Sequence, residues 1–221
     1  MTPVSHQHFL IVLGIAQDGG FPQAGCNSAC CRTAWEKPEL KKHVSCLGIV
    51  DPSHSKCWMI DATPDFPVQL QTLNSFSGQI TRSYLDGIFL THAHSGHYTG
   101  LTHLGKETMA SDNIPIYAMP EMTKFIQGNE PWKFYHDAGY LNLKNIQAGD
   151  SVGLSDQLHI TPITVPHRSE FTETVGYHIR GANTSVLFIP DIDSWHAWDQ
   201  SILEWISKVD YAFLDGTFFS K

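Results

Sequence analysis

Positive charge is scarce in this sequence. Lysine and arginine number 14 against 22 aspartates and glutamates, which gives a formal net charge of −8 over 221 residues. Nucleic-acid affinity rests largely on basic side chains that neutralise phosphates, and the densest basic stretch here is only Lys41-Lys42-His43. We therefore expect no nucleic-acid partner, and a small-molecule or peptide-derived substrate instead.

Long hydrophobic runs are also missing. No apolar stretch reaches the roughly 18 residues that a membrane-spanning helix needs. Residues 9–16 are apolar but lack the basic segment and the cleavage site of a signal peptide, so they are predicted to form a core strand. The sequence thus predicts no membrane partner and a cytoplasmic location, with a periplasmic one open if a leader precedes this numbering. It leaves the oligomeric state undefined.

Cysteine is sparse and unevenly placed. The sequence has five cysteines, and an odd number at irregular spacing does not indicate a disulfide framework. Cys26, Cys30 and Cys31 nevertheless lie within six residues, which is typical of a thiolate metal site. We predict a structural zinc there, with a fourth ligand from elsewhere, such as a distant histidine. The alternative is a set of reduced thiols in a loop.

Apolar residues make up 42% of the chain and aromatic residues 11%, which is enough for a substantial core. Runs of strands with helices spaced between them indicate stacked sheets with helices packed outside. We expect one domain over residues 1–221. The strands are predicted at 8–14, 46–50, 57–60, 88–90, 114–118, 158–165, 174–179, 185–189 and 211–214, and the helices at 66–73, 99–109, 120–127 and 198–207.

The segment His92-Ala93-His94-Ser95-Gly96-His97 carries the strongest functional signal. It follows an apolar run and Thr91, so it lies where a buried strand meets a loop. Alternate residues of an extended segment point the same way, so His92 and His94 can reach one metal ion. His97 faces elsewhere and can serve a second ion or the edge of the first. Imidazole suits zinc, iron and related metals.

Further polar residues end other predicted strands. Asp61, His167, Asp191 and Asp215 each follow an apolar run, and Asp65 is expected to cap the helix that begins after it. Taken singly, Asp61, Asp65 and Asp215 read as caps or turn residues. Taken together, these residues indicate one shared edge of the sheets, where functional sites are built.

The order of these motifs resembles the metallo-β-lactamase superfamily: a strand, His-x-His-x-x-His, a later isolated histidine and a strand that ends in aspartate. The resemblance is closer still to its pyrroloquinoline quinone (PQQ) biosynthesis B branch. The matching blocks are GGFPQ at 19–23, DATPD at 61–65, HSGHYTGL at 94–101, PHRSEF at 166–171, TVGY at 174–177 and LDGTF at 214–218.

This resemblance implies a mixed α/β fold, a four-layer αββα sandwich with metals at one edge of its two sheets. It implies that His92, His94 and His167 form a first metal site, that Asp191 bridges two metals, and that His97 binds the second. The cysteine cluster falls where some relatives carry a structural zinc, although its spacing differs.

Two departures from the superfamily pattern stand out. Gly96 occupies the place of an aspartate that usually serves the second metal, which leaves that site with His97, Asp191 and little else. A last histidine ligand usually follows the strand represented by residues 211–214, and this chain has none there. We therefore expect that the domain lacks its last C-terminal segment.

Three functions follow from the resemblance. The first is a metallo-hydrolase in which zinc, as one or two ions, activates water and Asp191 ligates metal or accepts a proton. The second is an iron-dependent oxygenation in PQQ biosynthesis, and the third is a non-catalytic metal-binding protein. Asp61 is expected to orient a ligand histidine, whereas Tyr98 and Arg168 are expected to contact an anionic substrate.

Overall fold

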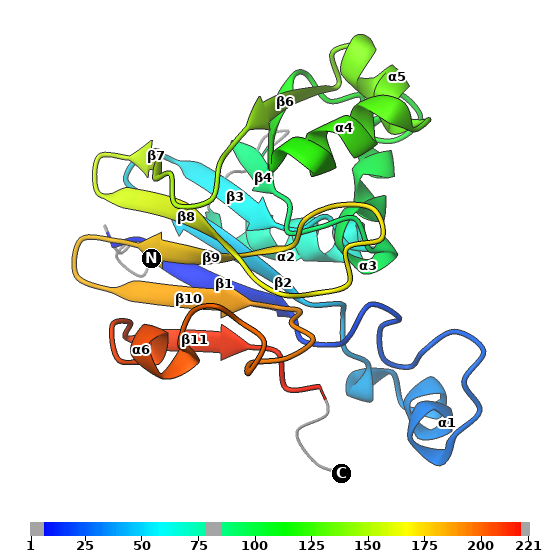
Figure 1. The fold of residues 1–221 in the computed structure, drawn as a ribbon. Coiled ribbons are helices and arrows are strands. Elements are labelled where there is room, and N and C mark those ends of the chain that lie inside the picture. The colour runs from blue at the N-terminus through cyan, green and yellow to red at the C-terminus, as the bar shows by residue number, and fades with distance from the viewer. Residues whose placement is uncertain (1–6, 78–84, 218–221) are drawn as a thin grey trace, which may run out of the picture.

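The computed structural model describes residues 7–77 and 85–217, and the strands in these ranges form two sheets (Figure 1). In the first sheet β1, β2 and β3 pair antiparallel, and β3 to β6 pair parallel. In spatial order its strands are β1 (Phe9–Gly14), β2 (Cys46–Asp51), β3 (Lys56–Ile60), β4 (Gly87–Phe89), β5 (Ile114–Ala118) and β6 (Leu141–Asn145).

The second sheet is antiparallel except at one edge, where β10 and β11 run parallel. In spatial order its strands are β11 (Tyr211–Leu214), β10 (Ser185–Ile189), β9 (Val175–Arg180), β8 (Leu158–Thr164) and β7 (Val152–Ser155). The described helices are α1 (Ala29–Glu36), η1 (Pro38–Leu40), α2 (Phe66–Ser77), α3 (Ser95–Tyr98), η2 (Thr99–Leu104), α4 (Pro120–Gly128), α5 (Trp132–Asp137) and α6 (Ile202–Ile206).

Strand alternation builds the layers. Along β2, Leu47 and Ile49 face the second sheet, whereas Cys46 and Val50 face the layer that holds α2 and α4. Each such buried aliphatic side chain contributes about 1.5–3 kcal/mol relative to an exposed one. A third cluster, which includes Leu187 of β10, covers the outer face of the second sheet beside α6. The order helices, sheet, sheet, helices confirms the predicted αββα sandwich.

The predicted strands match those of the structure to within about a residue, but two helices are shorter than expected. In place of one helix over 99–109, a single turn of α3 is followed by the 3₁₀ helix η2. Two glycines and three threonines weaken a longer α-helix in that range. In the 198–207 range, only Ile202–Ile206 is helical. No helix in the described ranges is long and apolar enough to cross a membrane.

Asp65 takes the predicted N-cap position directly before α2, but its side chain does not cap the helix. The Asp65 side chain does not bind the first turn of the helix; its Oδ2 accepts a hydrogen bond from the Val44 amide at 2.9 Å. The Asp65 backbone carbonyl accepts hydrogen bonds from the amides of Val68 and Gln69 in the first turn of α2. This contact ties the start of α2 to the segment before β2. It also fixes the end of the sheet where the histidine motif lies.

Candidate metal centre

Three strand ends place the histidine motif. Asp61 follows β3, Thr91 lies two residues after β4, and Asp191 follows β10 of the other sheet. Because β3 and β4 are parallel, their carboxyl ends meet at one edge of the first sheet. His92 and His97 are buried there, each with a side chain that is only 1% exposed.

Four side chains form a first ligand group, defined as His92, His94, His167 and Asp191. The Nδ1 atom of His94 lies 3.0 Å from Nε2 of His92 and 3.0 Å from Nε2 of His167. The Oδ2 atom of Asp191 lies 3.3 Å and 3.5 Å from the same two Nε2 atoms. Ligands bound at about 2.0–2.1 Å to a tetrahedral zinc lie about 3.3–3.4 Å apart. The residues present therefore fit a zinc-type ion.

The outward-facing nitrogens of the three rings support this interpretation. A ligand histidine almost always gives its second nitrogen to a carboxylate, carbonyl or similar partner, which orients the ring. The partners are Thr91 Oγ1 at 3.0 Å from His92 Nδ1, Glu170 Oε2 at 3.1 Å from His94 Nε2, and Asp193 Oδ1 at 2.7 Å from His167 Nδ1. Each ring thus holds one nitrogen outward and directs the other toward a common point.

Asp61 holds His97 in the same way. Its Oδ2 lies 2.7 Å from Nδ1 of His97, and its Oδ1 accepts a hydrogen bond from the Thr91 amide at 2.8 Å. The Asp61 backbone has a φ of 69°, a left-handed conformation that is uncommon for a non-glycine residue and costs energy. The buried carboxylate therefore lies between the two neighbouring strand ends and positions His97.

A second ligand group, defined as Asp18, His97 and Asp191, adjoins the first. The Nε2 atom of His97 lies 2.9 Å from Oδ1 of Asp18 and 3.3 Å from Oδ2 of Asp191. That Asp191 oxygen also serves the first group. The sequence predicts little beyond His97 and Asp191 at this second site, whereas the loop after β1 also brings the carboxylate of Asp18 to it.

Burial and neighbouring charges shift the pKa values of three side chains in the two groups. Burial raises the pKa of Asp191 by itself, but contacts with His92 and His97 outweigh it and hold that pKa well below its usual range. Burial and the neighbouring charge of His97 lower the pKa of His92 to about 3, so its lone pair is available at neutral pH. Burial also lowers the pKa of His97, but the surrounding carboxylates outweigh it and raise that pKa well above its usual value.

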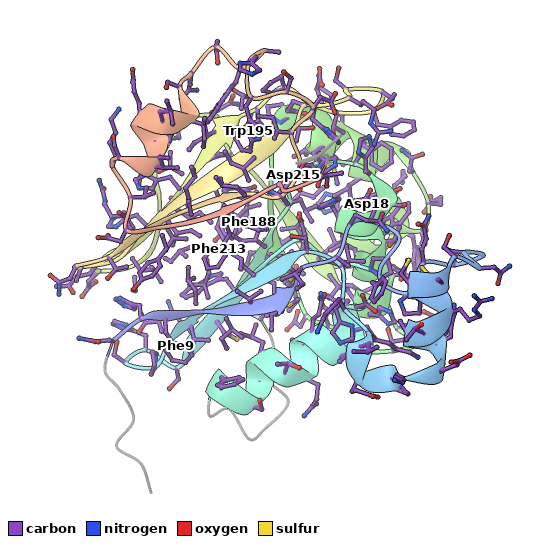
Figure 2. All side chains as sticks on the ribbon, turned by 90° about the horizontal axis from the view of Figure 1, so that it is seen from below. Phe9, Asp18, Phe188, Trp195, Phe213 and Asp215 are labelled. Carbon is purple, nitrogen blue, oxygen red and sulfur yellow. The ribbon has the colours of Figure 1, made fainter. Side chains whose placement is uncertain are left out.

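Asp191, which both ligand groups share, and Asp18 of the second group border a cleft of about 550 Å³. Its walls come from the end of β1 with Asp18, from the end of β10 with Asp191, and from β11 with Asp215. Figure 2 shows Asp18 and Asp215 at the same end of the sandwich. Asp215 accepts a hydrogen bond from the Ile192 amide, which secures the segment after Asp191. A small substrate can therefore approach Asp191 from this side.

The structure does not bring the two expected substrate contacts into the ligand groups. Tyr98 packs its ring against Phe125 and Trp132 in the helical layer. Arg168 is exposed on the loop after β8, beside the ligand His167. Their roles toward a substrate stay predictions.

The cysteine cluster lies at the start of α1, away from both ligand groups. Cys30 is exposed and Cys31 is buried. Cys26 has a lowered pKa because its thiol accepts hydrogen bonds from Ser28 and Cys31. Within the described ranges, the sets of converging ligand atoms are the two that contain histidine, and neither includes a cysteine.

Sequence reasoning missed Asp18, Glu170 and Asp193. Asp18 lies in a glycine-rich turn that reads as a loop, and Glu170 and Asp193 are exposed acidic residues. A partial signal exists for the last two, because each lies within three residues of a predicted ligand in the sequence. No comparable signal links Asp18 to His97, which follows it by 79 positions.

Comparison with known proteins assigns the chain to a family. The family described as "Beta-lactamase superfamily domain" matches residues 58–221. Since this match covers more than half of the chain, the protein belongs to the β-lactamase superfamily. Its curated relatives and a solved neighbour indicate the coenzyme PQQ synthesis protein B branch.

Two curated relatives illustrate the extent of the match. Coenzyme PQQ synthesis protein B of Rhodopseudomonas palustris (strain TIE-1) is 30% identical over 124 residues, which cover 54% of this chain and 38% of that protein. The protein of the same name from Xanthomonas campestris pv. campestris (strain B100) is 23% identical over 222 residues, which cover 94% of this chain and 72% of that protein.

Two solved structures share the fold. Zn²⁺-bound PqqB from Methylobacterium extorquens superposes with a TM-score of 0.67 at 23% identity, covering 83% of this chain and 62% of that one. A diphosphatase of the PhnP family superposes with a TM-score of 0.60 at 22% identity, covering 82% and 64%. The chain therefore spans less than two thirds of the length of either neighbour.

Proposed function

We propose that this protein is a metal-dependent hydrolase that acts on a small-molecule or peptide-derived substrate. One observation carries the proposal: three histidines and a carboxylate converge on one point, and that carboxylate, Asp191, also lines an open cleft. A bound zinc ion supplies a Lewis acid and lowers the pKa of water to about 7. Closed structural zinc sites offer no such access.

The chain's own residues take distinct roles in this proposal. His92, His94 and His167 hold the ion through the nitrogens that face one another. Asp191 ligates it and faces the cleft, and its low pKa keeps the carboxylate ionised as a metal ligand at neutral pH. Asp61 acts through His97 and is a positioning residue.

Iron chemistry is the second candidate. Three histidines and a carboxylate suit iron as well as zinc, and the curated relatives are named for PQQ synthesis. In this alternative the same four ligands hold iron for an oxygenation step in PQQ biosynthesis. A non-catalytic metal-binding role is the third candidate.

Metal content is the first measurement. Protein purified without added metal is assayed by elemental mass spectrometry, for wild type and for His92→Ala/His94→Ala. We expect zinc in the wild type and the loss of at least one equivalent in the variant. If the variant keeps the wild-type content, the first ligand group is not the metal site and the proposal fails.

Turnover then separates the three candidates. Zinc-loaded protein is tested on chromogenic phosphodiester, lactam and aryl ester substrates, with Asp191→Asn as the matched inactive control. Iron-loaded protein is tested for oxygen consumption with tyrosine-containing peptides. Hydrolysis that Asp191→Asn abolishes supports the first candidate, and oxygen consumption alone favours the second. If the protein binds metal tightly but shows neither activity, the third candidate is favoured.

The cysteine zinc stays a prediction with its own test. A variant with Cys26, Cys30 and Cys31 all changed to serine keeps the histidine ligands intact. Loss of one zinc equivalent, beyond what His92→Ala/His94→Ala removes, would support the structural zinc. An unchanged content would contradict it.

A further inference from the structure

The Nε2 atom of His97 faces more hydrogen-bond acceptors than one N–H group can satisfy. Its ring gives Nδ1 to Asp61, and its Nε2 faces carboxylate oxygens of both Asp18 and Asp191. One N–H can donate well to only one of those two oxygens. A divalent cation accepts a lone pair from the nitrogen and from both oxygens at once, which accounts for all three contacts.

We propose that Asp18 is a ligand of a second metal ion, together with His97 and Asp191, and that Gly96 is the residue that admits it. This inference rests on the proposed function, because the second ion shares the Asp191 carboxylate with the first. Two carboxylates and an imidazole are a donor set that suits zinc, manganese or iron.

Gly96 carries the geometric part of the argument. A Cβ atom built on Gly96 would lie 2.7 Å from Cα of Asp18 and 2.8 Å from both its Cβ and its Cγ. Because the first of these is a backbone atom, rotation of the Asp18 side chain does not relieve the contact. Any side chain at position 96 therefore displaces the loop that carries Asp18.

The same distances indicate that a carboxylate could come from position 18 or from position 96. A side chain on residue 96 would begin within 2.8 Å of the carboxyl carbon of Asp18. A carboxylate carried by residue 96 could therefore reach the same point beside His97. The geometry allows one carboxylate from either position, and excludes both together.

The Asp18 loop is held firmly enough to supply a ligand. The Ala16 amide donates to the His43 carbonyl at 2.8 Å. The Gln17 side chain closes the turn, because its Oε1 accepts the Gly19 amide at 2.8 Å and its Nε2 donates to the Gly20 carbonyl at 3.2 Å. Gly20 has a φ of 70°, which glycine adopts without strain. Asp18 is thus pre-positioned toward His97.

The test exchanges the carboxylate between the two positions. Zinc affinities for both equivalents are measured on metal-free protein by competition with a chromophoric chelator, for wild type, Asp18→Asn, Gly96→Ala and Asp18→Gly/Gly96→Asp. Asp18→Asn keeps the size of the side chain and removes the charge. Gly96→Ala adds only the Cβ atom, so it tests the space without offering a new ligand.

We expect two zinc equivalents at the two ligand groups of the wild type, apart from any equivalent that the cysteine cluster binds. In Asp18→Asn the first should keep its affinity and the second should weaken by at least about 100-fold, more than typical losses on removing an outer partner. Gly96→Ala should also weaken the second equivalent. In Asp18→Gly/Gly96→Asp the loop still shifts, because residue 18 keeps its Cα atom, but the loop no longer supplies the ligand. The carboxylate on residue 96 should therefore recover the second affinity to within about 10-fold of wild type.

Two results would overturn the inference. One is a second equivalent that Asp18→Asn leaves at wild-type affinity; the other is a wild type that stops at one equivalent and matches Asp18→Asn. The first equivalent reports folding of every variant, so Asp18→Asn remains decisive if the exchange variant does not fold. A wild type that binds no zinc would contradict the proposed function instead.

Discussion

Histidine and aspartate gather at both ends of the first sheet, with different outcomes. At one end lies the metal centre described above. At the other end of β2 lies the Asp51 cluster, defined as Asp51, His8, Ser53 and His54. Its carboxylate, which is 0% exposed, lies 2.8 Å from Nδ1 of His54 and 3.2 Å from Nε2 of His8.

The two regions differ in what the side chains face. In the Asp51 cluster, the donors of Ser53 and His54 converge on one carboxylate, which satisfies it. In the metal centre, the nitrogens of His92, His94 and His167 face one another. Lone pairs that converge need a cation, whereas donors that converge on a carboxylate do not. The direction of the ring nitrogens, more than composition, therefore distinguishes a metal centre from a structural cluster.

The largest expected effect comes from removing two ligand rings. His92→Ala/His94→Ala should abolish the first zinc equivalent and any hydrolysis, because two of its four ligands are lost. His8→Ala/His54→Ala is the matched control, since it removes two histidines from the Asp51 cluster. Elemental mass spectrometry should find the wild-type metal content in that control. A similar loss of metal in both variants would mean that the two regions do not differ in metal binding.

A smaller change to the shared carboxylate comes next. Asp191→Asn keeps the shape of the side chain but removes the charge that both ligand groups use. We expect the first zinc to weaken by more than about 100-fold, which exceeds the usual cost of losing an outer partner. Competition titration measures the affinity. An Asp191→Asn protein with wild-type zinc affinity would show that the contacts of 3.3 Å and 3.5 Å are not metal-ligand geometry.

A weaker effect should follow from the outer partner of His167. Asp193→Asn removes the charge that orients this ring, and such changes typically cost about 10–100-fold in metal affinity. The same chelator competition checks it. Asp199→Asn, an exposed aspartate outside both ligand groups, is the control and should change nothing. Equal affinities in the two variants would mean that Asp193 does not orient the ring.

Much of this fold could be predicted from periodicity. The strands at 185–189 and 211–214 agree with the structure to the residue, because a short apolar run bounded by turn residues has few alternative structures. The helix expected over 99–109 does not form as one helix, because its glycines and threonines disfavour an α-helix and Gly100 packs against the loop after β3. The first cause can be read in the sequence, whereas the second is a long-range contact that no local pattern contains.

The metal centre was predictable where its ligands share one short segment. His92 and His94 alternate just after β4, so their spacing alone predicted that they share one ion. His97 lies in α3, and the sequence predicted only that it faces elsewhere and serves a second ion or the edge of the first. Asp18 reaches His97 from another loop, and that contact depends on the absence of a side chain at Gly96. In the sequence, the glycine at position 96 indicates a lost metal ligand. In the fold, the absence of a side chain at Gly96 makes room for a different carboxylate, that of Asp18.

A substitution in the Asp51 cluster should have the smallest effect on metal binding. The change expected there is in the free energy of unfolding. Burial raises the pKa of Asp51 by itself, but hydrogen bonds from Ser53, Ser155 and His54 outweigh it and hold that pKa well below its usual range. A carboxyl group whose pKa is lower in the folded than in the unfolded state, about 3.9, stabilises the fold above that value. The contribution is lost as pH falls toward the folded pKa.

Asp51→Asn should therefore destabilise the protein by about 1–3 kcal/mol at pH 7, because the donors around it lose a charged acceptor. The difference from wild type should shrink as pH falls from 5 to 3, where the wild-type carboxylate begins to lose its advantage. Urea unfolding across this pH range measures it, and zinc content at pH 7 should not change. A stability difference independent of pH would mean that the Asp51 charge is not what the cluster stabilises. A loss of zinc would show that the two ends of β2 are coupled, which the separation of about 16 Å along five residues argues against.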